Sequence, residues 1–419
     1  MKFSRYDFAA YSLFMAYAAG SVIIPIALCH IAVSLDFPLE SGGLSSGGAL
    51  QVGRSLSMIP AMLLSGFLAG KWGLKKILGI AAVFMGVGIF LAGLAPFYSM
   101  LFFALSIAGI GEGLIEALAT PFVQKLHKKD PGQYINIAHS FWSVGVFLCV
   151  LGAGWLLLAG YSWRLPILIT ALLSLIPIYI LMKEDSAHSY PEDIRNYHRH
   201  EIWDQTTKIL RCPHFWLFFA AMFVAGGGEF GLTFWVASYI QLEFSATAWI
   251  AGIGTACFAG GMFIGRSGSG LFVKERFLQH LIVFTALFGT AISCFIPLIH
   301  SDWIIQAAQA YPFLKIFTQN TVLFPLLFLA GLGSAPFWPS VQSYSAIRLP
   351  KLDTTMLFII LSCAGIPGCG LITWFMGIIG NHYGLRASFI LIPICYLTLA
   401  ILISADWFFY RRQRRQQSI

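Results

Sequence analysis

The sequence predicts an all-α membrane protein with twelve transmembrane helices arranged as two pseudo-symmetric six-helix bundles. Of its 419 residues, 58% are hydrophobic and 11% charged, whereas a soluble domain carries roughly 25% charged residues. Apolar runs of roughly 20 residues, long enough for a helix to cross a ~30 Å hydrocarbon core, recur along the chain. Because these runs are continuous and lack period-2 alternation, they exclude a soluble globule and argue against a β-barrel.

Six expected spans precede a long polar connection and six follow it. The twelve spans lie at about 8–33, 46–70, 77–96, 98–124, 135–160, 163–183, 213–240, 246–273, 279–298, 320–346, 354–380 and 384–410. The first residues run directly into a long apolar stretch without a small-residue cleavage site. We therefore expect an uncleaved first helix and not a signal peptide.

Short motifs repeat at matching spans of the two halves. Ser-Gly-Phe-Leu at 65–68 precedes Lys71, and Ser-Gly-Leu-Phe at 269–272 precedes Lys274; Ala-Gly-Ile-Gly at 108–111 matches Ala-Gly-Leu-Gly at 330–333. We therefore expect an N-terminal bundle at 1–183, a cytoplasmic linker at 184–212, a C-terminal bundle at 213–410 and a basic cytoplasmic tail at 411–419. Parallel halves of this kind are typical of transporters with alternating access to a midplane site.

The distribution of charge predicts the orientation in the membrane. The net charge is +8, and 21 of the 26 Lys and Arg residues fall in segments that are cytoplasmic if the N-terminus is inside. The positive-inside rule therefore places both termini in the cytoplasm of a multi-pass plasma (cell inner) membrane protein. The basic balance reports topology, so no nucleic-acid partner is expected. Single, scattered cysteines and the absence of P-loop, catalytic-triad or metal-ligand spacing predict no enzyme, cofactor or metal site.

Ionisable residues inside the spans are costly and are functional candidates. Glu112 and Glu116 lie four residues apart on the fourth span, so their carboxyl groups share one helical face about 6 Å apart. Two such acids do not both ionise readily in a low dielectric, and one is expected to hold a proton. We assign both to proton coupling, with Glu116 as the coupling acid tuned by Glu112. The alternative for Glu112 is a structural ion pair with Arg54 of the second span.

The other two intramembrane charges lie in the second half. Glu229 follows Gly226-Gly227-Gly228, and three glycines in mid-span favour a bent or broken seventh helix. Glu229 is a candidate acceptor for substrate hydroxyls, a proton site, or a hydrogen-bond partner for loosened backbone. Arg266 lies near the cytoplasmic end of the eighth span and is expected to be structural, either snorkelling or capping carbonyls. Arg54 leaves open an anionic sugar as substrate.

Polar and aromatic residues accompany these charges on three spans. Sugar sites combine carboxylate and amide acceptors for hydroxyls with aromatic faces for C–H surfaces. We expect such groups to bind substrate together with Glu229: Asn136, His139, Trp142, Trp235, Trp338 and Gln342.

Two adjoining spans carry the motifs GLIEALATPFV at 113–123 and NIAHSFWSVG at 136–145, and later spans carry GEFG at 228–231, GRSGSG at 265–270 and PFWPS at 336–340. In these motifs the sequence resembles the fucose permease branch of the major facilitator superfamily. The resemblance implies a cation-coupled, usually proton-coupled, sugar uptake carrier in which the acid matching Glu116 contributes to substrate binding and coupling. Ser21 stands where the family has a first-span acid, and Trp142 stands where it has an amide.

These observations predict a secondary active transporter that carries a monosaccharide or related polyol together with a proton, by alternating access. Its partners would be a sugar-like small molecule, a coupling cation and the lipid bilayer. An exporter of cationic or amphipathic compounds is the first alternative, because intramembrane acids and aromatic residues suit that function too. A non-transporting membrane sensor with the same fold is the second.

Overall fold

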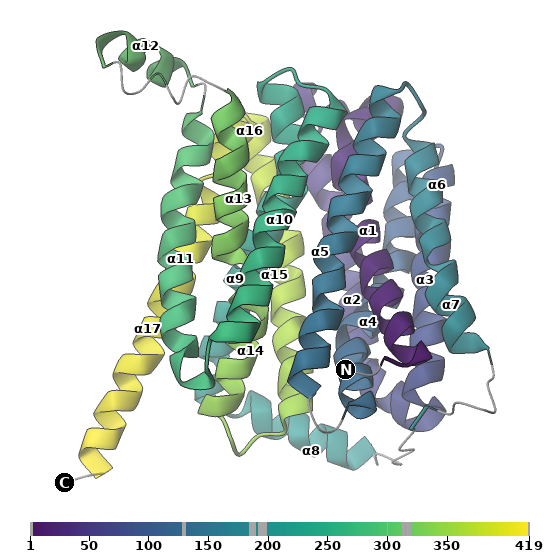
Figure 1. Cartoon of the computed structure of the whole chain (residues 1–419), viewed down its shortest axis with the longest axis vertical. Helices are drawn as coiled ribbons and strands as arrows, with labels where there is room; N and C mark the ends of the chain where they lie inside the picture. Colours follow the sequence, from purple (N-terminus) through teal and green to yellow (C-terminus); the bar gives the residue numbers. More distant parts are fainter. Residues whose placement is uncertain are drawn as a thin grey trace.

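The computed structural model describes residues 3–127, 131–183, 190–191, 199–299, 301–311, 315 and 320–417. These residues form helices and connections without a β-strand among them. Twelve helical segments are long and apolar enough to cross a membrane, which confirms the predicted fold class. The segments stand side by side, and the chain begins and ends at the same end of the bundle (Figure 1).

The elements follow the order expected from the sequence. The first half contains α1 (Arg5–Ser34), α2 (Leu44–Trp72), α3 (Leu74–Leu94), α4 (Tyr98–Leu126), α5 (Pro131–Leu158), α6 (Arg164–Leu173) and α7 (Leu175–Met182). The second half contains α9 (Pro213–Glu243), α10 (Ala248–Phe272), α11 (Leu278–Phe295), α13 (Leu323–Ser334), α14 (Phe337–Arg348), α15 (Thr354–Tyr383), α16 (Leu385–Ser388) and α17 (Leu391–Gln417).

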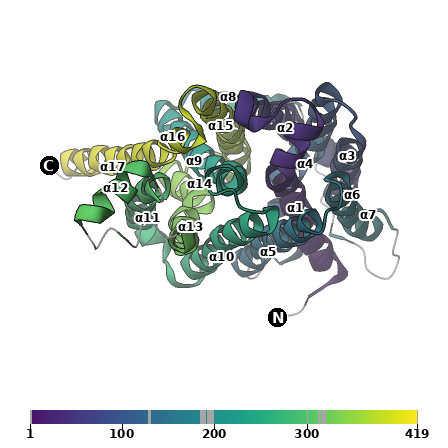
Figure 2. The same cartoon turned by 90° about the horizontal axis from the view of Figure 1, so that it is seen from above.

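The two bundles meet along two main seams. Extensive contacts join α2 to α15 and α5 to α10, and these pairs lie on opposite sides of the molecule when it is viewed from above (Figure 2). Within each bundle, the largest contacts join α3 to α4 and α2 to α4 in the first half, and α9 to α15 and α10 to α13 in the second. The space between the seams is where a site between the halves can form.

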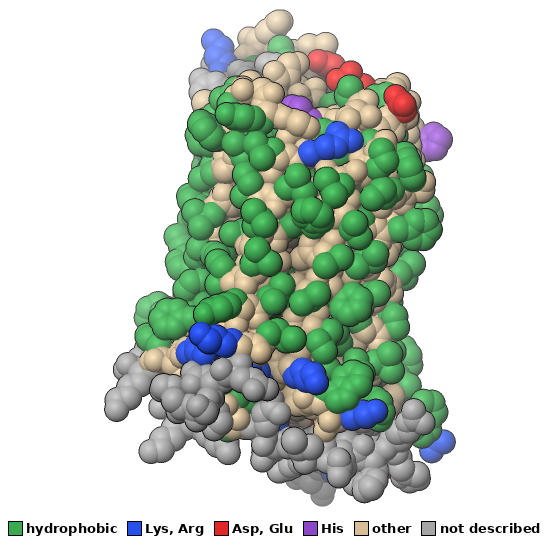
Figure 3. Space-filling view, turned by 90° about the vertical axis from the view of Figure 1, so that its right-hand side faces the viewer, with side chains coloured by type: hydrophobic (Ala, Val, Ile, Leu, Met, Phe, Trp, Pro, Cys, Tyr) green, Lys and Arg blue, Asp and Glu red, His purple; other side chains and the backbone are tan. Residues whose placement is uncertain are grey.

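The outer surface is that of a membrane protein. Hydrophobic side chains cover the middle of the face in Figure 3, whereas Lys and Arg lie near its rims and acidic side chains near its upper end. Phe84 and Phe90 on α3, for example, expose 39% and 45% of their surface. Apolar side chains of this kind are stable in contact with lipid hydrocarbon. The helices form their backbone hydrogen bonds internally, as a bilayer without water requires.

Two expected spans are interrupted where prolines follow. The sixth span divides into α6 and α7 at Ser174, three residues before Pro177, and the tenth divides into α13 and α14 at Ala335 and Pro336. Proline lacks the N–H that would bond the preceding turn, so it weakens the helix at that point. The break in the tenth span matters because it frees a carbonyl beside the cavity.

The expected break in the seventh span is wrong, because α9 runs continuously through Gly226, Gly227 and Gly228. These glycines instead allow close helix packing. A Cβ on Gly226 would lie 2.5 Å from the carbonyl oxygen of Gly365 on α15, and one on Gly228 would lie 2.5 Å from the Tyr396 ring on α17. The three glycines therefore let neighbouring helices approach closely, and they do not break α9.

Three elements lie outside the twelve spans or extend one of them. α8 (Arg199–Leu210) follows the connection between the halves, and α12 (Asp302–Ala310) precedes the tenth span at the end opposite the termini (Figure 1). Residues 184–189 and 192–198 of the expected linker lie outside the described residues. The backbone of the expected basic tail continues α17 as far as Gln417.

Close packing at Gly226 predicts that Gly226→Ala lowers the free energy of unfolding by about 1–3 kcal/mol, because the added methyl group meets rigid backbone. The thermal unfolding midpoint in detergent, followed by tryptophan fluorescence, measures this loss. Gly66→Ala is the matched control, since nothing lies within 4 Å of a Cβ at Gly66. Equal midpoints for the two variants would contradict the packing role of Gly226.

Candidate functional site

A cavity of about 570 Å³ lies between the two halves. Its lining comes from α1, α2, α4 and α5 of the first half and from α9, α10, α14 and α15 of the second, with the start of α11 at the edge. The lining reaches Gln124 on α4, Thr354 on α15 and Glu275 beyond α10, which are exposed and lie on the side of the chain termini. The cavity therefore opens towards that side, and its size is within the range of small-molecule sites.

The opposite end is sealed by contacts between the halves. The side-chain oxygen of Asn381 on α15 accepts from the backbone N–H of Leu44 at 3.0 Å, and its amide nitrogen donates to Ser45 at 2.7 Å. A Cβ at Gly48 would lie 2.8 Å from the Trp374 backbone, and one at Gly154 on α5 would lie 2.8 Å from the Ala248 carbonyl on α10. Small residues thus let both seams close tightly at this end, so the structure has access from one side.

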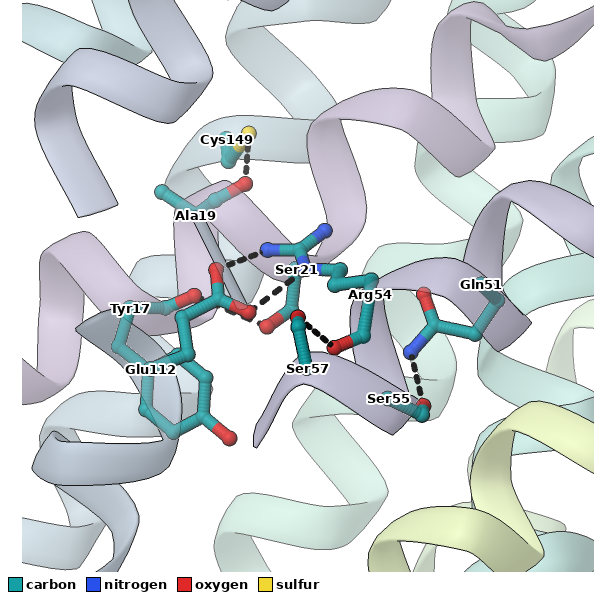
Figure 4. A network of polar contacts seen from close by, with 9 residues as sticks. All are labelled: Tyr17, Ala19, Ser21, Gln51, Arg54, Ser55, Ser57, Glu112 and Cys149. Atoms are coloured by element: carbon teal, nitrogen blue, oxygen red, sulfur yellow. Dashed lines mark hydrogen bonds and ion pairs between the residues drawn. The ribbon is translucent and has the colours of Figure 1, made fainter. Parts of the chain in front are cut away.

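An ion pair between Arg54 and Glu112 forms the first-half wall of the cavity (Figure 4). Arg54 Nε donates to Glu112 Oε2 at 2.6 Å, and Arg54 Nη2 bonds the other oxygen, Oε1. The two side chains are 2% and 1% exposed. This bidentate arrangement uses both carboxylate oxygens, so each charge neutralises the other, which burial in a low dielectric requires.

Glu116 lines the same cavity one helical turn further along α4. Within the described part of the chain, no Lys or Arg lies within ion-pair distance, 4 Å, of its carboxyl group. Its polar neighbours come from both halves: Tyr17 on α1, Trp338 on α14, and the charges of Arg266 and Glu229. Among the described residues, Glu116 is therefore a carboxyl group without an ion-pair partner, and it faces the opposite half.

A second ion pair forms the wall of the other half. Arg266 Nη2 on α10 donates to Glu229 Oε1 on α9 at 2.7 Å, and Arg266 Nε donates to the backbone carbonyl of Ala335 at 3.2 Å. Ala335 lies four residues before Pro339, which has no N–H to give to that carbonyl. The proline thus frees an acceptor, and Arg266 uses it. The sequence suggested that Arg266 caps carbonyls, but not that it reaches Glu229 inside the cavity.

Uncharged polar and aromatic side chains complete the lining. His139 Nε2 on α5 and the Thr120 hydroxyl on α4 are hydrogen-bonded at 3.0 Å, and the Gln342 amide on α14 donates to the Ser362 hydroxyl at 3.2 Å. The Trp142 ring packs edge-on against Tyr17 with centroids 4.7 Å apart. Hydroxyl, amide and imidazole groups beside flat aromatic rings suit a polar solute with apolar C–H faces.

Trp338 owes its position to a glycine on the facing helix. A Cβ on Gly365 of α15 would lie 2.5 Å from the Trp338 ring, so the indole lies directly against the backbone there. The ring borders the cavity from α14, just beyond the break that separates it from α13. The same short segment therefore supplies an aromatic wall and the carbonyl that holds Arg266.

The structure brings most of the predicted site residues together. The cavity is lined by nine of them: Arg54, Glu112, Glu116, His139, Trp142, Glu229, Arg266, Trp338 and Gln342. Trp235 does not line it: this residue is fully buried, donates its indole N–H to the Thr373 carbonyl at 2.9 Å, and packs beside Gly47 of the other half. The side chain of Asn136, on α5, lies outside the described residues.

Sequence reasoning missed several uncharged lining residues. Tyr17 on α1 and Gln51 and Ser55 on α2 all border the cavity. Gln51 and Ser55 flank Arg54 within one turn, so the helical period places polar groups on the face that carries the intramembrane charge. That signal was present in the sequence, whereas Tyr17 resembled the many other aromatic residues of the spans.

Two six-helix bundles around a polar cavity deep in the membrane define the class of alternating-access membrane transporters. The sequence model of the Major Facilitator Superfamily matches residues 9–311, and the chain belongs to this family. None of the curated proteins matches it.

Solved structures of sugar transporters share the fold. The fucose:proton symporter FucP of E. coli is 19% identical with a TM-score of 0.64, over 95% of this chain and 97% of that one. FucP in an outward conformation is 18% identical with a TM-score of 0.64 and the same coverage. A partially occluded inward-open conformation of the xylose transporter XylE of E. coli is 14% identical with a TM-score of 0.71, over 96% of this chain and 97% of that one.

The buried pair predicts that Arg54→Met and Glu112→Leu, made singly, each lower the free energy of unfolding by about 3–5 kcal/mol, since each strands a buried charge. The double variant should recover most of the loss because no charge is left unpaired. Thermal unfolding of the purified protein in detergent measures all three. If each single variant unfolded at the wild-type temperature, the two groups would not depend on each other for charge neutralisation.

Proposed function

We propose that this transporter carries a neutral polar solute of monosaccharide size together with one proton. The observation that carries the proposal is the charge balance of the cavity inside its mouth, where Glu275 is exposed: three carboxyl groups face two guanidinium groups, and both guanidinium groups are already paired. Glu116 is the acid left over. A proton on Glu116 makes the set neutral, which lowers the free-energy cost of enclosing it with solute away from water.

Glu116 is the coupling acid in this proposal. Protonation removes the one uncompensated charge, and hydroxyl groups of the solute complete the hydrogen bonds of the carboxyl group as the cavity closes. Only the carrier with both proton and solute, or with neither, then changes its side of access at low cost. Glu112 acts indirectly, because its pairing with Arg54 leaves Glu116 as the group that exchanges protons.

The remaining lining residues bind and enclose the solute. Glu229, His139 and Gln342 are the polar groups that we assign to hydroxyl recognition, together with Asn136 on α5. Trp142 and Trp338 form aromatic walls for C–H surfaces. Trp235 is assigned a supporting role at the closed end of the cavity because its only polar atom is bonded to the Thr373 carbonyl.

The pairing of both arginines disfavours a sugar acid as the substrate. Arg54 is bound through two nitrogens to Glu112, and Arg266 is bound to Glu229 and a backbone carbonyl. A carboxylate of a solute would have to displace a carboxylate of the protein from either one. A neutral sugar needs no such exchange, and the solved structures of similar fold include transporters named for fucose and xylose.

The orientation follows from the charges that flank the spans. The positive-inside rule assigns the side of the termini to the cytoplasm, and on that assignment the cavity opens to the cytoplasm. We place the protein in the plasma (cell inner) membrane and propose uptake as its direction. Export of a cationic compound is the second candidate, because the unpaired carboxylate of an ionised Glu116 could also bind a positively charged solute.

Transport into proteoliposomes tests the proposal. The panel contains L-fucose, D-xylose and D-glucose as neutral sugars, D-glucuronate as an anion and D-glucosamine as a cation. A neutral sugar should accumulate under an inward proton gradient, up to about tenfold per pH unit for one coupled proton. Accumulation of D-glucuronate alone would overturn the assignment of a neutral solute, and efflux of a cation without sugar accumulation would favour the second candidate.

Glu116→Gln should abolish gradient-driven accumulation, because the amide mimics the protonated acid permanently and no proton is exchanged. Exchange of labelled for unlabelled sugar across the membrane should continue. Glu40→Gln, a substitution of an exposed acid outside the cavity, is the matched control and should accumulate sugar as the wild type does. Unchanged accumulation in Glu116→Gln would remove Glu116 from coupling.

A further inference from the structure

We propose that Arg266 is a coupling residue shared by the two halves. In the open cavity it pairs with Glu229, and when the empty cavity closes around an ionised Glu116 it bridges to that carboxylate as well, across the gap between the halves. This inference rests on the proposed role of Glu116. It assigns Arg266 to the return of the empty carrier, a step that the structural role expected from the sequence does not include.

The first argument is that the Arg266–Glu229 pair is not saturated. Arg54 and Glu112 use two nitrogens and both oxygens, whereas Arg266 meets Glu229 through Nη2 and Oε1. Glu229 Oε2 is buried and has no hydrogen-bond partner among the described residues. The hydrogen bonds of Arg266 in the structure use Nε and Nη2, which leaves Nη1 available for another acceptor.

The second argument is that the guanidinium group is held in place from behind. The Ala335 carbonyl that Pro339 leaves unbonded accepts from Nε at 3.2 Å. This bond fixes the plane of the fork at the cavity wall, 15% exposed, instead of letting the long side chain extend to the membrane surface. A fixed fork with a spare N–H is suited to bridging two carboxylates, because its donors diverge in one plane.

The third argument is the position of Glu116 on the opposite half. The titratable and charged groups that line the cavity with it are Tyr17 on α1, Arg54 on α2, Glu112 on α4, His139 on α5, Glu229 on α9, Arg266 on α10, Glu275 at the exposed mouth and Cys369 on α15. Of the two cations, Arg54 is fully engaged by Glu112. Arg266 is therefore the countercharge on which an ionised Glu116 depends when water leaves the cavity.

A bridge from Arg266 to Glu116 would couple loss of the proton to closure of the empty carrier. An empty carrier with ionised Glu116 closes because Arg266 bridges to it. An empty carrier with protonated Glu116 lacks that attraction and lacks the solute hydroxyls, so closure leaves polar groups unsatisfied. Exchange of solute by the protonated carrier does not use the bridge. Loss of Arg266 should therefore stop net accumulation and spare exchange.

The test uses Arg266→Gln together with Glu229→Gln, so that neither charge is stranded. With the sugar that the wild type accumulates in the panel above, the double variant is compared with Glu229→Gln alone, because Glu229 is itself assigned to hydroxyl recognition. Relative to Glu229→Gln, the double variant should lose at least tenfold in gradient-driven accumulation and keep exchange within about threefold. The control is Arg386→Gln with Glu243→Gln, a half-buried pair of 2.9 Å in the same half, away from the cavity, which should keep both activities.

Arg266→Lys provides a second variant, because it retains the charge and should retain a larger part of the accumulation than the double variant. Wild-type accumulation in the double variant would overturn the proposal. So would a loss of exchange in the folded double variant that goes beyond the loss in Glu229→Gln alone, since Arg266 would then serve solute binding. An Arg266→Lys variant that accumulates no more than the double variant would also contradict a role that depends on charge.

A measurement without solute separates this inference from the proposed function. Spin labels at Gln124 and Thr354, which are exposed on opposite sides of the mouth, report its width. The mouth of the wild type should narrow as the pH rises and Glu116 ionises, and the Arg266→Gln, Glu229→Gln variant should lose this response. A pH response equal in both proteins overturns the inference even if sugar transport is established; a wild type that narrows but moves no sugar overturns only the proposed function.

Discussion

Everything at the centre of this protein depends on how five charges are buried in a membrane. Isolated charges in hydrocarbon are costly, so each must be paired or neutralised by a proton. Arg54 is paired with Glu112 and Arg266 with Glu229, one pair in each half. Glu116 is the fifth charge, and among the residues that the structure describes it has no permanent partner. We propose that it is compensated by a proton that binds and dissociates, or by a guanidinium group that approaches when the cavity closes. In the mechanism that we propose, the cavity closes around Glu116 when a proton or the guanidinium of the opposite half compensates it.

The fold supports this balance through local devices that lie far apart in the sequence. Pro339 frees the carbonyl that holds Arg266, and the glycine at 365 makes room for the Trp338 ring beside it. Small residues allow α2 to close against α15 and α5 against α10 at the end remote from the termini. Because these seams carry the contacts between the halves, closure at one end leaves the charged cavity accessible from the other.

The sequence predicted the twelve spans well because span length and the position of charged residues are set by the bilayer itself. It also offered the pair of Arg54 and Glu112 as an alternative, since few partners exist inside a membrane. It did not predict that Arg266 turns inward to Glu229, because the direction of a long side chain near a helix end depends on a carbonyl from another helix. The glycines of the seventh span allowed two interpretations, and only the facing backbone of Gly365 distinguishes packing from breakage. Trp235 carried no sign in the sequence that it packs behind the cavity and not in it.

The central claim is that one proton compensates one leftover carboxyl group while a neutral solute is carried. Its most direct test is the ratio of electrical charge to solute moved, measured by recording currents from proteoliposomes on a solid-supported membrane alongside uptake of labelled sugar. The account predicts one positive charge per sugar molecule, moving in the same direction as the sugar. Electroneutral transport, or two charges per sugar, would contradict it, because either result would require a different set of uncompensated groups in the cavity.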